Sequence, residues 1–179
     1  RDIAPGLIPH LVEKVEEAER FLFSLYGWRV NRRISIVFDR EYDDANGWSQ
    51  VYRKDAVRLL LFPPEEFSVL ANHKDYALNL IVHELTHSLQ IGLVSGVPKW
   101  VNYLFGNLLF PAQVSPGWLL EGVSVYSESA IDGSGRLHSP LWRAWFDSFF
   151  QKGNVLSIAE ISGSTDHWMG GHLPYLYGS

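Results

Sequence analysis

Residues 81–89 read IVHELTHSL, an apolar window with helical periodicity that holds two histidines four residues apart. Side chains four apart on a helix lie one turn above each other, with Cβ atoms about 5–6 Å apart. The imidazoles of His83 and His87 can then reach one zinc ion at roughly 2.0–2.1 Å. Glu84 lies off this spacing, so it is placed to hold water beside the metal instead of binding it. The window predicts a metal-binding helix.

A chance occurrence of the His-Glu-x-x-His pattern is the alternative. Chance matches usually lie in surface helices or loops, whereas residues 77–82 read ALNLIV and make this helix strongly apolar. Two histidines and a glutamate would be costly to bury in such a helix without partners. The apolar context therefore favours a metal site.

Residues 115–122, SPGWLLEG, offer a third ligand. Ser115 is a good N-cap and Pro116 suits the first helical position, so Glu121 is expected in the next turn, among apolar neighbours. A lone carboxylate there needs a cation, and catalytic zinc takes three protein ligands and leaves one position for water. The alternative is a partly exposed glutamate near a helix start, stabilised by the helix dipole.

Outward from these motifs, the chain changes from one helix to strands and then to several helices. Helices are expected over residues 8–26, 75–91, 98–104, 116–130 and 140–150, and short strands over 34–38, 48–52 and 56–62. This segregation favours an α+β fold over a doubly wound parallel sheet. We expect a single catalytic domain over 1–179, with a helix-plus-sheet lobe over about 1–74 and a helical, metal-binding half over about 75–179.

Composition narrows the class of partner and of metal ligand. The 179 residues are 46% hydrophobic and 20% charged, which is ordinary for a globular protein. A net charge of -5 without a basic cluster argues against nucleic acid. The chain has no cysteine, so any metal must be bound by nitrogen and oxygen. No apolar run approaches the roughly 20 residues that would span a bilayer.

The pattern over residues 83–87, the sequence WLLEG at 118–122 and Tyr126 together resemble the gluzincin metallopeptidases, especially the MA-like and M1-like branches. The resemblance covers about the last 100 residues. It implies a zincin-like fold, with a small mixed sheet packed on the active-site helix, and zinc-dependent hydrolysis of a peptide or protein substrate. One zinc ion is implied, with ligands His83, His87 and Glu121, and with Glu84 as general base.

The sequence PYLYG at residues 174–178 is similar to a segment of M1-like enzymes whose tyrosine stabilises the tetrahedral intermediate. The resemblance implies this catalytic role for Tyr175. Tyr177 is a competitor, and a tyrosine of the core or the surface is the alternative.

Two further roles follow from the resemblance. Glu128 matches a family glutamate and could orient a zinc-bound histidine, with a solvated glutamate on the helix face as an equal alternative. By analogy with zincins, Asn46, Gly47, Trp48 and the strand after them form the edge along which an extended substrate binds.

The chain also departs from the family. The Gly-x-Met-Glu-Asn segment that anchors a substrate amino terminus in M1-like aminopeptidases is absent, so exopeptidase action is not supported. Because the family usually continues beyond the equivalent of Ser179, we expect a fragment of a longer protein. The resemblance to the family also implies a location outside the cytoplasm. A catalytically inactive binding module, or a zinc hydrolase of a non-peptide amide or ester, are the alternative functions. The sequence does not indicate the oligomeric state.

Overall fold

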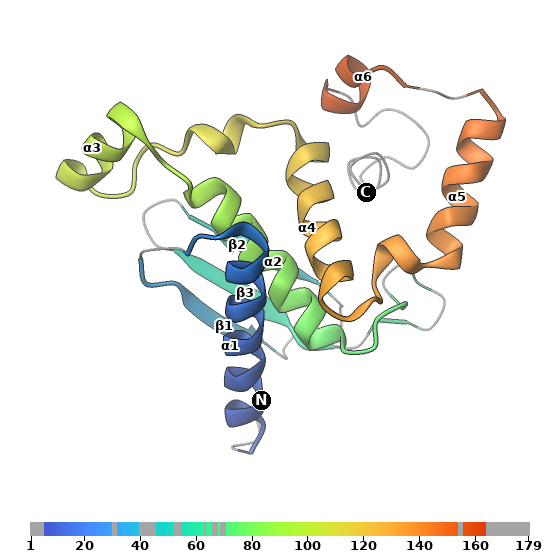
Figure 1. Cartoon of the computed structure of the whole chain (residues 1–179), viewed down its shortest axis with the longest axis horizontal. Helices are drawn as coiled ribbons and strands as arrows, with labels where there is room; N and C mark the ends of the chain where they lie inside the picture. Colours follow the sequence, from blue (N-terminus) through green and yellow to red (C-terminus); the bar gives the residue numbers. More distant parts are fainter. Residues whose placement is uncertain are drawn as a thin grey trace.

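The structure is a computed structural model that describes residues 6–29, 32–39, 46–51, 55–62, 64–65, 68, 71–153 and 156–163. This part of the chain is α+β, with one small sheet and mostly helical content, as the sequence predicts (Figure 1). No helix in it is long and apolar enough to cross a bilayer. The elements are α1 (Leu7–Tyr26), β1 (Ser35–Asp39), β2 (Gly47–Gln50), β3 (Ala56–Leu60), α2 (Tyr76–Gly92), α3 (Gly96–Phe105), the 3-10 turn η1 (Pro111–Val114), α4 (Gly117–Asp132), the 3-10 turn η2 (Arg136–His138), α5 (Pro140–Gln151) and α6 (Ile158–Gly163).

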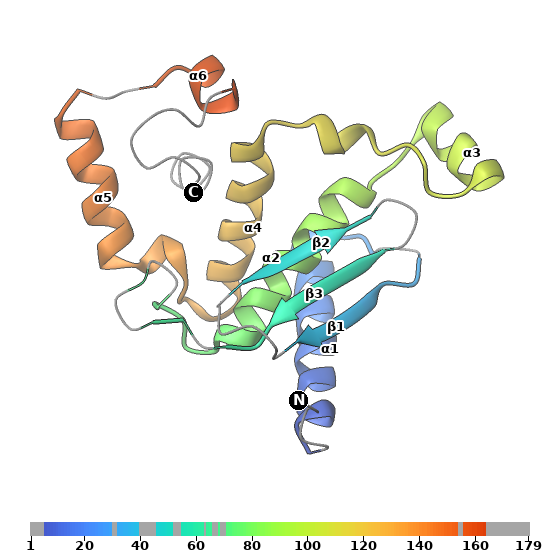
Figure 2. The same ribbon diagram turned by 180° about the vertical axis from the view of Figure 1, so that it is seen from behind.

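The sheet has the strand order β1-β3-β2 and is mixed. β1 pairs with β3 in parallel, with Val37 opposite Arg58, and β2 pairs with β3 in antiparallel, with Ser49 opposite Val57. Figure 2 shows the three strands in front of α1 and α2, so both helices lie behind the same face of the sheet. β2 lies at the edge of this sheet and contacts α2 directly.

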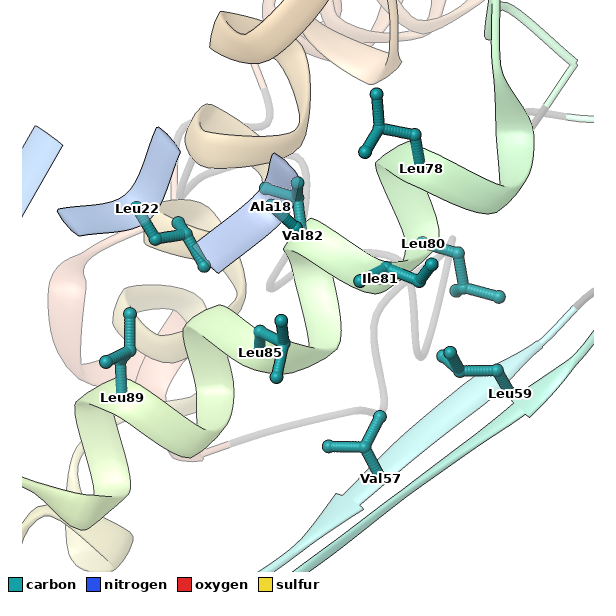
Figure 3. Packing of buried hydrophobic residues seen from close by; sticks show 10 residues of the cluster. All are labelled: Ala18, Leu22, Val57, Leu59, Leu78, Leu80, Ile81, Val82, Leu85 and Leu89. Carbon is teal, nitrogen blue, oxygen red and sulfur yellow. The ribbon is translucent and has the colours of Figure 1, made fainter. Parts of the chain in front are cut away.

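Helix α2 runs through the centre of the molecule between the sheet, α1 and α4. Its apolar side chains pack with those of α1 and β3 in one buried cluster, which Figure 3 shows; its members are Ala18, Leu22, Val57, Leu59, Leu78, Leu80, Ile81, Val82, Leu85 and Leu89. Each large aliphatic side chain buried in this way contributes roughly 1.5–3 kcal/mol. The helix that carries both histidines is therefore held firmly in place from several sides.

The ends of the first two helices follow from their sequence. Gly27 ends α1 with a left-handed φ of 74°, and its N–H donates to the Phe23 carbonyl, as expected of a glycine stop. Asp75 caps α2, because its side chain accepts a hydrogen bond from the Leu78 N–H.

The start of α4 differs from the prediction that Ser115 is the N-cap and Pro116 the first helical residue. Pro116 itself takes the cap position, with no side-chain cap, and its carbonyl accepts hydrogen bonds from Leu119 and Leu120. Ser115 belongs to the end of η1, because its N–H donates to the Ala112 carbonyl. Ser115 therefore ends η1 and does not cap α4.

Candidate metal centre

Two adjacent helices bring three candidate ligands to one point. His83 and His87 lie one turn apart on α2, and Glu121 lies in the second turn of α4, which packs along α2. The two Nε2 atoms are 3.1 Å apart, and Glu121 Oε2 lies 3.3 Å from that of His83 and 3.4 Å from that of His87. Among the described residues these three form a group that could hold a metal ion, as the sequence predicts.

The spacing of the three atoms suits a small divalent cation. Two ligand atoms that are each 2.0–2.1 Å from a tetrahedral zinc lie about 3.3 Å from each other. Glu121 Oε2 is buried and makes no well-directed hydrogen bond, although it is at ion-pair distance from both rings. A carboxylate oxygen and two imidazole nitrogens that face one point suit a cation bound between them. The donor set of His83, His87 and Glu121 therefore fits zinc.

A buried ion pair between Glu128 and Arg136 lies beside Nδ1 of His83. Its Nδ1 lies 2.8 Å from Glu128 Oε2, and Arg136 donates from Nε to Glu128 Oε1 over 2.8 Å and from Nη2 to Oε2 over 2.7 Å. Glu128 is only 1% exposed, so the alternative of a solvated helix-face glutamate is wrong. With Nδ1 directed at this carboxylate, Nε2 of His83 is directed at the candidate metal position.

His87 is oriented by neutral groups. Its Nδ1 lies 3.2 Å from Ser124 Oγ on α4, and Gln90 Nε2 donates to the same hydroxyl and to the Leu120 carbonyl. Ser124 is fully buried. Both rings therefore have a partner at Nδ1 and present Nε2 to the common point, which is the usual arrangement around a histidine-ligated metal.

The charges of the site are strongly coupled. Burial lowers the pKa of His83, and so does Arg136, but the adjacent carboxylates of Glu121 and Glu128 outweigh both and raise the pKa to about 9. Burial raises the pKa of Glu121, yet the contacts with His83 and His87 hold it far below its usual value. Burial also raises the pKa of Glu128, but Arg136 and His83 lower it more. Without metal, the site at neutral pH therefore holds two carboxylates and a protonated His83.

The Glu84 side chain contacts the edge strand β2. It is 5% exposed, and the Ser49 hydroxyl lies 2.9 Å from its Oε2 and 2.7 Å from its carbonyl oxygen. Gly47 lies so close that an added Cβ would be 3.0 Å from Glu84 Cγ and 3.1 Å from Oε1. The expected substrate edge and the expected general base are therefore in contact.

Only part of the expected substrate edge contacts Glu84. The Asn46 carbonyl accepts a hydrogen bond from Leu60 N–H, and β2 begins at Gly47. Because side chains alternate along a strand, Trp48 points to the sheet face opposite Glu84, where the Arg58 guanidinium lies 5.4 Å from its ring centre. Tyr175, like its competitor Tyr177, lies outside the described residues.

The likeness to gluzincins rests on this chain's own residues. No protein-family model matches the chain, and neither a curated protein nor a solved structure matches it.

Proposed function

We propose that the chain is a zinc-dependent peptidase of zincin-like fold, in which His83, His87 and Glu121 hold one zinc ion. The observation that carries the proposal is the buried Oε2 of Glu121, which has no hydrogen-bond partner and faces the two Nε2 atoms. Glu84, next to the first ligand in sequence, remains free of the metal group and can act as a base.

Zinc supplies Lewis acidity, which polarises a carbonyl oxygen and makes water nucleophilic near neutral pH. In the proposed reaction the Glu84 carboxylate accepts the proton of the attacking water and then delivers it to the leaving amine. Ser49 and Gly47 keep this carboxylate against β2. Tyr175 is assigned the stabilisation of the oxyanion from the sequence alone.

The proposed substrate is an extended stretch of peptide or protein. β2 is an edge strand of the described sheet, so one side of its backbone can pair with an added strand. The strand contacts Glu84 through Gly47 and Ser49, which would bring the backbone of a substrate paired with β2 close to the proposed base. Binding through main-chain hydrogen bonds would leave sequence preference to side-chain pockets.

A metal assay combined with a hydrolysis assay tests the proposal. We expect about one zinc per chain by elemental analysis, and cleavage of dye-labelled casein that stops after chelation and returns with added zinc. Glu121→Ala should lose both zinc and cleavage. Full zinc occupancy without cleavage of casein or of a peptide library would contradict the peptidase proposal and favour a binding module. Cleavage restricted to model esters or small amides would favour the non-peptide hydrolase.

A further inference from the structure

An exposed apolar surface lies on the connection between the two ligand-bearing helices. α3 projects from the body of the molecule in both views (Figures 1 and 2). No residue of α3 is buried, and Trp100 and Tyr103 are 68% and 80% exposed. The apolar tip, as we name it, consists of Leu93, Val97, Trp100, Tyr103, Leu104, Phe105, Leu108, Leu109 and Val114.

The apolar tip is folded even though it does not pack on the core. Asn102 Oδ1 accepts hydrogen bonds from the N–H groups of Leu108 and Leu109, and its Nδ2 donates to the Leu109 carbonyl over 2.7 Å. Phe110, which follows directly, is buried and anchors the returning chain. α3 itself makes at most marginal contact with the other described elements. A ten-residue helix of this kind is marginal in water on its own. A binding partner that covers its exposed apolar side chains would stabilise it.

The distribution of apolar and charged side chains over the apolar tip indicates the class of partner. Val97, Trp100 and Leu104 share one side of α3 by their spacing, while Lys99 and Asn102 lie on the other. Residues 85–120 contain no Asp or Glu, and Lys99 is their one lysine or arginine, although the whole chain has a net charge of -5. Aromatic and aliphatic side chains on one side of a helix and a lysine on the other, without acidic groups, suit the boundary between lipid headgroups and acyl chains.

We propose that the apolar tip docks this protein on the surface of a lipid bilayer that contains anionic lipids. α3 would lie in the plane of the headgroups, with Trp100 and Leu104 among the acyl chains and Lys99 directed to the lipid phosphates. A second copy of the chain is the rival occupant, and it would show itself as dimerisation through the same side chains. The proposal does not depend on the peptidase function.

Vesicle co-sedimentation of the full chain tests the proposal. Wild type should bind vesicles of phosphatidylcholine with one quarter phosphatidylglycerol. Trp100→Ser combined with Leu104→Ser should weaken that binding at least about tenfold, because two apolar side chains no longer leave water. The matched control replaces Ile8 and Val12, an exposed apolar pair with the same spacing on α1, by serine and should bind like wild type.

A second variant tests the contribution of the Lys99 charge, and circular dichroism checks that all variants are folded. Lys99→Gln should weaken binding to the anionic vesicles about fivefold and leave any binding to pure phosphatidylcholine unchanged. Circular dichroism should show all variants folded, because the replaced side chains are exposed. Wild type that stays in the supernatant, or a Trp100/Leu104 variant that binds as tightly as wild type, would overturn the proposal. So would concentration-dependent dimerisation that the same variant abolishes, since the tip would then serve a second copy.

Discussion

Arg136 and Glu128 form a two-point ion pair in the interior, with Nε to Oε1 at 2.8 Å and Nη2 to Oε2 at 2.7 Å. The same Glu128 carboxylate reaches Nδ1 of His83. Glu128 lies seven residues after Glu121 on α4, so one helix supplies both a candidate ligand and the partner that orients another. The arrangement links α2, α4 and η2 behind the candidate metal position.

We expect Arg136→Gln to destabilise the fold and to weaken metal binding together. The variant leaves the buried Glu128 carboxylate without its cation, which typically costs about 3–5 kcal/mol in the free energy of unfolding. His83 then loses a fixed partner at Nδ1, so the affinity for zinc should fall about 10- to 100-fold. Urea unfolding in the presence of a chelator and competitive zinc titration measure the two effects separately.

Two further variants calibrate this result. Arg136→Lys keeps the charge but cannot donate through the guanidinium fork, so it should lie between wild type and Arg136→Gln. Arg143→Gln on the exposed side of α5 should change the free energy of unfolding by less than about 0.5 kcal/mol. If Arg136→Gln were as stable as Arg143→Gln and bound zinc as tightly, the buried pair would have no structural role.

Glu84→Gln should separate metal binding from turnover. The amide keeps the volume of the side chain and can still contact Ser49, and Glu84 is not among the three candidate ligands, so zinc content should stay at the wild-type level. Loss of the base should lower kcat/KM about 10²- to 10⁴-fold. Glu17→Gln on the exposed face of α1 is the control and should behave like wild type. Cleavage by Glu84→Gln at the wild-type rate would show that another group is the base.

The metal-free protein should be most stable in mildly acidic solution. The pKa of His83 is raised from 6.5 to about 9, so its contribution is complete below pH 6.5 and is lost as the pH rises through 9. The pKa values of Glu121 and Glu128 are lowered from 4.5, so their contribution is present above pH 4.5 and is lost as the pH falls below it. Urea unfolding with a chelator should therefore give a maximum between about pH 4.5 and 6.5.

Zinc should change the alkaline side of this profile. The metal replaces the proton on His83, so with saturating zinc the decline between pH 6.5 and 9 should disappear. Stability of the chelated protein that stays constant or rises from pH 6.5 to 9 would be inconsistent with a protonated His83 in the folded state.

The sequence predicts the elements of this fold better than their arrangement. The window at residues 81–89 has both helical periodicity and a ligand pattern, so α2 lies within one residue of its expected bounds. The parallel pairing of β1 with β3, with β2 outside, was not predicted, because strand order depends on contacts distant in sequence. The Ser115 prediction failed for a local reason: the preceding 3-10 turn uses that residue.

The sequence likewise indicates some residues of the candidate site and not others. Glu121 could be found because a lone carboxylate in an apolar stretch needs a cation. Arg136 carries no such signal, since it lies in a short polar turn where an arginine is ordinarily solvated, and only folding brings it to Glu128. The contact of Gly47 with Glu84 is also invisible in the sequence, because 37 positions separate a strand glycine from a helix carboxylate.

Gly47→Ala should impair catalysis while it preserves the metal site. The added Cβ would be 3.0 Å from Glu84 Cγ and 3.1 Å from both Oε1 and Leu80 Cδ1, so β2 or the Glu84 side chain must shift by a few tenths of an ångström. Overpacking of this kind costs about 1–3 kcal/mol in stability. The atoms nearest to the added Cβ belong to Glu84 and Leu80 and not to His83, His87 or Glu121, so zinc content should match wild type while kcat falls several-fold. Gly6→Ala, where the added Cβ meets nothing within 4 Å, is the control, and equal kcat values for the two variants would show that the close approach of β2 does not position the base.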